Sequence, residues 1–303
     1  MRENLDIRLG PIGLSNPLVA ASGTVGSVVE FANVIDFTNY GAATAKSVAP
    51  EPWPGRKPPR MTPTDHGMLN GIGIQNPGID RWLEKVGPRI DNVPTQMWGS
   101  VVAHDPDGFA VVASRMAGSG VAAIEVNLSC PNLEGAAFAL DPVLSGQVVA
   151  AVRDVTDLPL GAKLSPDATP ILPVADAVMI AGADWVVVAN TIMGAAIDIE
   201  TRRPALSSLT GGYSGSAIRP ITMRCVLEIA SGLPEVPILA CGGVSHANHV
   251  IEYLLAGASA VAIGTAHFAR PRVARRIVKD LNRYLRKHDI EDIATLTGAY
   301  EPW

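Results

Sequence analysis

The chain has 303 residues, a formal net charge of −5, and a composition that is 48% hydrophobic and only 5% aromatic. The negative charge and the scarcity of aromatic residues argue against nucleic acid or an anionic membrane as a partner, since those surfaces attract basic and base-stacking proteins. The charged start, Met1–Asp6, lacks the apolar core of a signal peptide, and no apolar run approaches the roughly 20 residues of a membrane span, so we expect a soluble, cytosolic protein.

Eight short apolar runs alternate with Ala-rich helical patterns along the chain, and we expect each run to be a buried strand. In chain order the runs are Leu18–Ala21, Ala42–Ala45, Thr95–Trp98, Ala123–Val126, Leu160–Leu164, Trp185–Ala189, Pro237–Ala240 and Ala260–Gly264. Gly182 and Gly257 each precede a run and are typical of glycines that end a helix. Eight strands in alternation with helices predict a parallel sheet closed into a (β/α)8 TIM barrel.

The rival architecture is an open, doubly wound sheet, which usually begins with a Gly-rich nucleotide-binding fingerprint that this chain lacks. No composition shift divides the chain, so we expect one domain over residues 1–303. The Pro-rich stretch Pro50–Pro63 follows the second predicted strand, and we interpret it as an inserted loop.

Polar residues and glycines gather where the predicted strands end, which is the edge of a (β/α)8 barrel that carries active sites. These positions are Ser22, Lys46–Ser47, Asn127–Asn132, Lys163, Asn190–Thr191, Gly242–Gly243 and Gly264–Thr265. A lysine is rarely buried without a partner. Lys46 and Lys163 therefore indicate anions, a substrate carboxylate near the first and an electron-rich cofactor near the second, unless both side chains simply extend into solvent.

The two glycine positions at the seventh and eighth strands suggest a phosphate site, because backbone amides approach a phosphate most closely where no Cβ intervenes. This region of a barrel frequently binds phosphate. Together with Lys163 and a thiol after strand four, the pattern suits a flavin mononucleotide across the barrel mouth.

Asn127-Leu128-Ser129-Cys130-Pro131-Asn132 places one thiol between carboxamides and a hydroxyl, directly after a buried strand. A thiol whose neighbours favour its thiolate can remove a proton, and amides can hold a planar substrate across from it. The alternative is a buried structural cysteine, the commoner fate of a free Cys.

Other titratable residues show weaker patterns. The six histidines lack metal-ligand spacing, and His246 and His249 suit surface or capping roles at a helix start. Cys225 and Cys241 are expected to be packing cysteines. The basic residues from Arg275 to Lys287 are expected to form the solvated face of a terminal helix.

Nearly end to end, the chain resembles class 1 dihydroorotate dehydrogenases, most closely the class 1B catalytic subunit. The resemblance depends on Asn127-x-Ser129-Cys130-Pro131-Asn132 and on Gly67–Gly78, whose Gln-Asn-Pro-Gly ending is typical of class 1B. Further matches are Ala21–Thr24, Lys163–Pro166, Asn190-Thr191-x-x-Gly194, Thr210-Gly211-Gly212-x-Ser214-Gly215 and Gly264–Ala266. Class 2 enzymes use a serine as base and carry an N-terminal membrane segment, whereas this chain has Cys130.

The resemblance implies FMN-dependent oxidation of (S)-dihydroorotate to orotate in pyrimidine biosynthesis, with Cys130 as the base that takes the C5 proton while a hydride passes from C6 to N5 of FMN. The implied substrate-binding residues are Lys46, Asn70, Gly71, Ile72, Gly73, Ile74, Asn127, Asn132, Asn190 and Thr191. The implied cofactor-binding residues are Ser22, Lys46, Ser47, Ser100, Asn127, Lys163, Ala189, Gly215, Gly242, Gly243, Gly264 and Thr265. Ser100 stands where the family usually has an asparagine, and the loop Leu133–Leu140 would close over the substrate.

The resemblance also implies a homodimer and, in class 1B, a second subunit with FAD and a [2Fe–2S] cluster that passes electrons to NAD⁺. The three cysteines of this chain cannot themselves hold such a cluster. Class 1A enzymes instead use fumarate. Two other functions stay open: a flavin barrel acting on a related dihydropyrimidine, which should alter the asparagine set, and a flavin-free, phosphate-binding isomerase or synthase.

Overall fold

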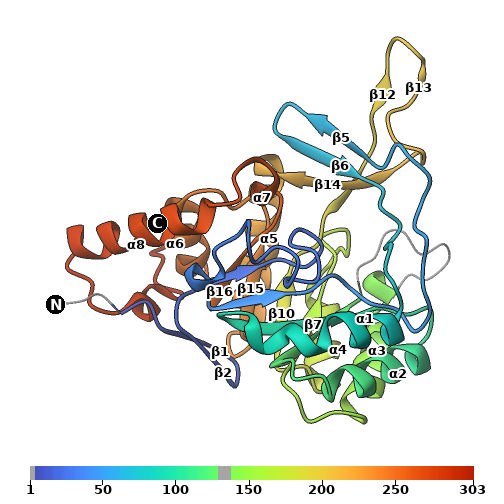
Figure 1. Cartoon of the computed structure of the whole chain (residues 1–303). Helices are drawn as coiled ribbons and strands as arrows, with labels where there is room; N and C mark the ends of the chain where they lie inside the picture. The colour runs from blue at the N-terminus through green and yellow to red at the C-terminus, as the bar shows by residue number, and fades with distance from the viewer. Residues whose placement is uncertain (1–3, 129–137) are drawn as a thin grey trace.

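The computed structural model describes residues 4–128 and 138–303. Eight parallel strands of these residues close into a barrel, in which each strand lies between its neighbours in chain order (Figure 1). The barrel strands are β3 (Leu18–Ala20), β4 (Ala42–Thr44), β7 (Gln96–Val101), β8 (Ala123–Asn127), β9 (Leu160–Lys163), β10 (Trp185–Val188), β15 (Ile238–Cys241) and β16 (Ala260–Ile263). Each predicted run overlaps one of these strands, so the predicted (β/α)8 barrel is confirmed.

Helices cover the outside of the barrel, and local sequence explains several of their ends. The α-helices are α1 (Ile79–Lys85), α2 (Pro106–Ala117), α3 (Pro142–Arg153), α4 (Leu172–Ile180), α5 (Arg219–Gly232), α6 (Ala247–Leu255), α7 (Ala266–Ala269) and α8 (Val273–Lys287). The 3-10 helices are η1 (Phe37–Asn39), η2 (Gly87–Asn92), η3 (Phe138–Leu140), η4 (Ser216–Ile218) and η5 (Ile293–Leu296). Asp105 caps α2 by accepting from the Gly108 amide at 2.7 Å. As predicted, α4 and α6 are followed by glycines in the left-handed region, Gly182 and Gly257.

A second, antiparallel sheet stands over the barrel mouth (Figure 1), and we call it the cover sheet. Its order is β11 (Ile192–Gly194), β14 (Gly211–Gly215), β6 (Gly67–Asn70) and β5 (Met61–Thr64). Two small hairpins, β1 (Ile7–Leu9) with β2 (Ile12–Leu14) and β12 (Ile197–Asp198) with β13 (Arg203–Pro204), complete the strands described. The stretch Pro50–Pro63 is therefore not entirely a loop as predicted, because its end enters β5. Pro63 is tolerated there because β5 is an edge strand, where a missing N–H leaves no ladder bond unmade.

Inside the barrel, alternate residues of each strand point to the interior and form layers. Trp98 and Trp185 are fully buried with ring centroids 5.3 Å apart, and Gly161 leaves room for the Trp185 indole. Glu125 is paired in register with Gly161 on one side and Ser100 on the other. The register two residues further along β8 places Asn127 beside Lys163. The layers therefore change from aromatic to polar toward the mouth.

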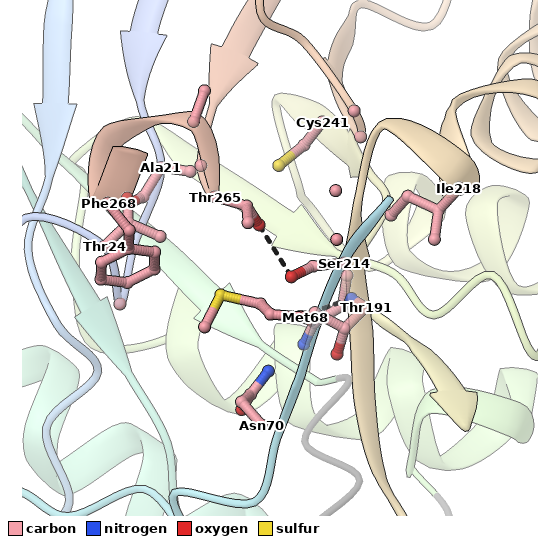
Figure 2. A pocket seen from close by; sticks show the side chains of 18 of the residues that line it. Ala21, Thr24, Met68, Asn70, Thr191, Ser214, Ile218, Cys241, Thr265 and Phe268 are labelled. Atoms are coloured by element: carbon pink, nitrogen blue, oxygen red, sulfur yellow. Dashed lines mark hydrogen bonds between the residues drawn. The ribbon is translucent and has the colours of Figure 1, made fainter. Parts of the chain in front are cut away.

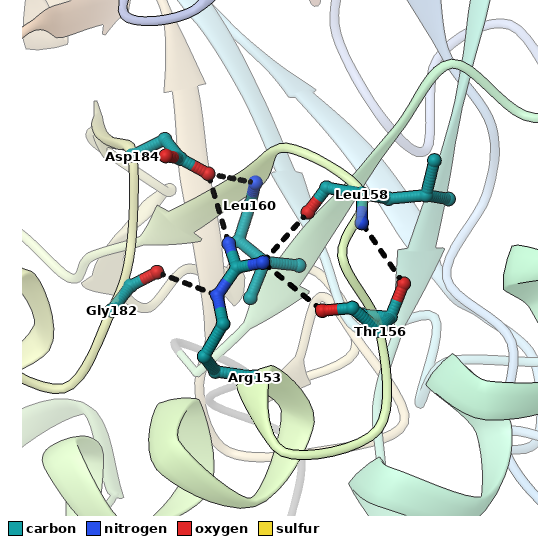
Figure 3. Close-up of polar contacts among 6 residues, drawn as sticks. All are labelled: Arg153, Thr156, Leu158, Leu160, Gly182 and Asp184. Atoms are coloured by element: carbon teal, nitrogen blue, oxygen red, sulfur yellow. Dashed lines mark hydrogen bonds and ion pairs between the residues drawn. The ribbon is translucent and has the colours of Figure 1, made fainter.

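The opposite end of the barrel, where β9 and β10 begin, is tied together by Arg153 at the end of α3 (Figure 3). Its guanidinium donates to the carbonyl oxygens of Thr156, Leu158 and Gly182 and to Asp184 Oδ2, at 2.9–3.1 Å. Asp184 Oδ2 also accepts from the Leu160 amide at 2.7 Å. These bonds fix the starts of β9 and β10 relative to α3. Because Lys163 is the last residue of β9, they also fix its position along the barrel axis.

None of the helices in the described ranges is both long and apolar enough to cross a bilayer.

Candidate active site

A cavity of about 610 Å³ lies between the mouth of the barrel and the cover sheet (Figure 2). Its volume is within the range of small-molecule sites, roughly 300–1,000 Å³. Most of the residues singled out from the sequence line it: Ser22, Lys46, Ser47, Asn70, Ile72, Ile74, Asn127, Lys163, Ala189, Asn190, Thr191, Gly215, Gly242, Gly243, Gly264 and Thr265. Residues far apart in the chain thus meet around one space.

The remaining predicted residues lie elsewhere. Cys130 and Asn132 fall outside the described residues. Gly71 and Gly73 are not part of the lining; Gly73, with φ of +69°, packs against the backbone of Arg56. Ser100 is fully buried behind the lining, because β7 does not end at Trp98 as predicted but continues to Val101.

Ser100 nevertheless contacts the cavity indirectly through Ser47. The two hydroxyl oxygens lie 2.9 Å apart, and Ser47 Oγ also accepts from Asn127 Nδ2 at 3.0 Å. Ser22 Oγ donates to the Ala45 carbonyl at 2.7 Å, joining the ends of β3 and β4. These bonds hold the side chains at the ends of four neighbouring strands in fixed orientations.

A buried ion pair lies at the floor of the cavity. Lys163 Nζ is 3.7 Å from Glu125 Oε1, and these residues are only 6% and 2% exposed. The alternative that Lys163 extends into solvent is therefore excluded, since its side chain stays inside the barrel. Burial of a lysine at this depth is tolerated because a carboxylate faces it.

Carboxamides and a lysine line other parts of the cavity. Asn70, on β6, donates from Nδ2 to the Gly212 carbonyl of β14 at 3.1 Å. Asn190 Oδ1 accepts from the Thr191 amide at 2.8 Å. Lys46 lies beside Gly23 of the loop after β3. Amides that both donate and accept, beside an ammonium group, suit a flat anionic molecule with ring carbonyl and N–H groups.

Glycine turns at the ends of β14, β15 and β16 form the opposite part of the cavity. Gly215 and Gly243 have φ of +113° and +67°, and the Gly242 carbonyl accepts from the Tyr253 hydroxyl at 2.8 Å. Burial raises the pKa of Tyr253, which keeps this hydroxyl a neutral donor. Thr265 Oγ1 donates to Ser214 Oγ at 2.7 Å, joining the turn after β16 to the cover sheet (Figure 2). Backbone amides free of Cβ atoms fit the phosphate of a mononucleotide.

Several lining residues were not predicted from the sequence. Cys241, expected to be a packing cysteine, directs its sulfur toward the cavity (Figure 2), and burial raises the pKa of its thiol. Ser214 lies within a motif that the sequence had shown, so its place was detectable. His66 and His246 also line the cavity, whereas Cys225 is fully buried in α5 as expected. Within residues 4–128 and 138–303, no cluster of His, Cys, Asp and Glu could hold a metal ion.

The family model described as dihydroorotate dehydrogenase matches residues 5–285. The chain belongs to the dihydroorotate dehydrogenase family. A protein of Trichlorobacter lovleyi named "Dihydroorotate dehydrogenase B (NAD(+)), catalytic subunit" is 41% identical, covering 99% of this chain and all of the relative. One of the same name from Alkaliphilus metalliredigens is 37% identical over 98% of this chain and 99% of the relative.

A crystal structure of dihydroorotate dehydrogenase from Eimeria tenella, in complex with ferulenol, has the same fold. The TM-score is 0.82 at 21% sequence identity, over 98% of this chain and 88% of that one. The predicted membership in class 1B of the dihydroorotate dehydrogenase family is confirmed by the full-length relatives rather than by this distant structure.

Proposed function

We propose that this chain is the catalytic subunit of a class 1B dihydroorotate dehydrogenase, which oxidises (S)-dihydroorotate to orotate in pyrimidine biosynthesis. The observation that carries the proposal is that one cavity brings together three groups of residues. These are the glycine turns, Lys163, and the carboxamides beside Lys46. Relatives that match the chain over nearly its full length bear the corresponding name. The substrate offers a carboxylate to Lys46 and ring carbonyl and N–H groups to Asn70, Asn127 and Asn190.

The cofactor that fits this cavity is FMN. Gly215, Gly242, Gly243 and Gly264 with Thr265 would hold its phosphate through backbone amides, and Lys163 would lie beside the part that becomes anionic on reduction. FMN supplies the acceptor for the hydride that leaves C6 of the substrate. Ser22, Ser47 and Ala189 would bind the rest of the cofactor along the barrel mouth.

We propose Cys130 as the base that takes the C5 proton, on the grounds of its motif, Asn127-x-Ser129-Cys130-Pro131-Asn132. Loss of the C5 proton to the thiolate and of the C6 hydride leaves the C5=C6 double bond of orotate. Within this proposal residues 1–303 form one flavin-binding unit, which assembles as a homodimer with electron-transfer subunits carrying FAD and a [2Fe–2S] cluster.

An anaerobic titration tests the proposed function. The purified protein should be yellow, and dihydroorotate should bleach its flavin absorbance at about one equivalent per site. Dihydrouracil, which lacks the carboxylate, is the matched control and should bleach it far more slowly, because Lys46 is left without its anion. A colourless protein would instead favour a flavin-free isomerase or synthase, and equal bleaching by both compounds would favour a different dihydropyrimidine.

A further inference from the structure

The least expected charge in the barrel belongs to Glu125, on β8 below the cavity. Its side chain is buried, and its Oε1 has no hydrogen-bond donor within reach among the described residues. The nearest cation is Lys163 Nζ at 3.7 Å, so the two groups meet as an ion pair without a direct hydrogen bond. Beneath them the barrel is closed by Trp98 and Trp185.

Packing alone gives no reason for this pair. Both charges must leave water, and a buried ion pair is often no more stabilising than neutral side chains of similar volume. An amide or an apolar side chain at position 125 would fill the same space without that desolvation. The Lys163 ammonium has a role at the proposed FMN site, and Glu125 is the negative charge placed to offset it.

We propose that Glu125 is a positioning residue that acts through Lys163, holding its ammonium group at the cavity floor and lowering the reduction potential of the bound flavin. This inference rests on the proposed FMN site. A cation beside the flavin favours the reduced, anionic form, and a carboxylate behind that cation weakens the effect. The pair thus keeps the local charge near zero in the oxidised state.

Cys241 gives an independent view of the same pair. Desolvation raises the pKa of its thiol most strongly, Lys163 lowers it, and Glu125 raises it. The Cys241 sulfur faces the cavity (Figure 2), so it can be alkylated in protein from which the flavin has been removed. Its reactivity therefore reports the charge at position 125 without any cofactor present.

The decisive variant is Glu125→Gln, which removes the charge and keeps the shape. We expect the two-electron equilibrium of the bound flavin to shift about tenfold toward the reduced form, which corresponds to about 30 mV for a two-electron couple. The measurement is a spectroscopic titration against a reference dye.

Two further variants serve as a control and as a graded change. Asp80→Asn removes one carboxylate at an exposed position that pairs with Arg115, and should leave the potential unchanged. Glu125→Asp keeps the charge but withdraws it from Lys163, and should give an intermediate shift of about two- to threefold, or about 9–14 mV. If Glu125→Gln does not fold, a potential for Glu125→Asp equal to that of the parent protein overturns the inference.

The second measurement is the pH dependence of Cys241 alkylation in flavin-free protein, followed by mass spectrometry of the labelled peptide. Glu125→Gln should move the profile to lower pH, and Asp80→Asn should not. An unchanged potential in Glu125→Gln with FMN bound overturns the inference. Failure of the parent protein to bind FMN would overturn the proposed function instead, and the Cys241 profile would still decide whether Glu125 controls the pair.

Discussion

Cys130 is the residue on which the proposed chemistry depends most directly. A free thiol has a pKa of about 8.5, so proton abstraction near neutral pH needs a lowered pKa or deprotonation linked to substrate binding. General-base catalysis typically contributes 10²–10⁴-fold, and Cys130→Ala should lose turnover by about that factor while keeping its flavin. Cys130→Ser should keep a remnant whose rate rises toward higher pH.

Stopped-flow measurement of flavin reduction by dihydroorotate would check the Cys130 prediction. Flavin absorbance in the two variants is the control for an intact cofactor site. Reduction at the parent rate in the alanine variant would show that another group takes the proton.

The turn at Gly242 permits a second prediction at the scale of single residues. A Cβ on Gly242 would press on Thr222 Oγ1 and lie 2.8 Å from Thr222 Cβ, and Thr222 is buried in α5. Overpacking of this kind typically costs about 1–3 kcal/mol, so Gly242→Ala should lower the free energy of unfolding by that amount and weaken FMN binding.

Gly264→Ala is the matched control, because its Cβ would meet Ala21 and Thr24 only at an ordinary 3.7 Å. Denaturant unfolding of the flavin-free proteins should leave Gly264→Ala close to the parent and Gly242→Ala clearly below it. Equal stabilities for the two variants would contradict the prediction, because they would mean that the turn at Gly242 shifts to accommodate the Cβ at no energetic cost.

At the same scale, Ser100 shows where sequence patterns stop being informative. The apolar run ends at Trp98, which predicted a strand end there, with Ser100 beyond it as a cofactor-binding residue implied by the family resemblance. Gly99 faces outward and makes room for the Met116 side chain of α2, which lets β7 continue past Trp98. That contact joins two elements and is invisible to a local pattern.

At the scale of elements, His267 joins α7 to the loop after β3 and to Tyr40. Thr24 Oγ1 donates to the Ala21 carbonyl, so His267 Nδ1 must carry the proton that Thr24 Oγ1 accepts, at 2.9 Å. His267 Nε2 then accepts from the Tyr40 hydroxyl at 2.7 Å. This chain of hydrogen bonds fixes Ala21 and Thr24, which line the cavity beside the proposed phosphate site.

The buried His267 gives the fold a pH dependence of known sign. Burial lowers its pKa from 6.5 to about 4. Between these values the unfolded chain binds a proton that the folded chain does not, so stability falls as the pH drops from 6.5 toward 4, by about 3 kcal/mol at most. We expect His267→Gln to flatten this part of the stability profile.

Urea unfolding at a series of pH values from neutral to about 4 would measure the effect of His267, the lower limit being its folded-state pKa. His288→Gln, which changes an exposed histidine after α8, is the control for the general effect of removing an imidazole. Parallel profiles for the parent protein and His267→Gln would contradict the prediction.

At the scale of the whole molecule, the barrel could be predicted from the sequence and the cover sheet could not. Each barrel strand is a local apolar run followed or preceded by helical sequence. The glycines after α4 and α6 show where each helix ends and the chain enters the next strand. The cover sheet pairs β6 with β14, so residues 67–70 lie beside residues 212–215. No sequence pattern within either segment predicts that pairing. Because of the pairing, Asn70 and Ser214 line the side of the cavity that the cover sheet forms.

The whole chain also constrains where electrons leave the protein. A [2Fe–2S] cluster takes four cysteine thiolates, and this sequence has three cysteines, of which Cys225 is buried in α5 and Cys241 lines the cavity. The chain lacks the Gly-rich dinucleotide fingerprint that would bind NAD⁺. We therefore expect the isolated, FMN-loaded chain to oxidise dihydroorotate with an artificial dye but to form no NADH.

The test is an anaerobic acceptor screen on the isolated chain, with NADH absorbance, dye bleaching and orotate formation followed together. Dye reduction is the control that the flavin is reduced at all, and fumarate distinguishes the class 1A pattern of electron transfer. Addition of an electron-transfer subunit with FAD and a [2Fe–2S] cluster should restore NADH formation, because its cofactors bridge the proposed flavin site and NAD⁺. NADH formed at a comparable rate by the pure chain alone would show that it needs no such partner.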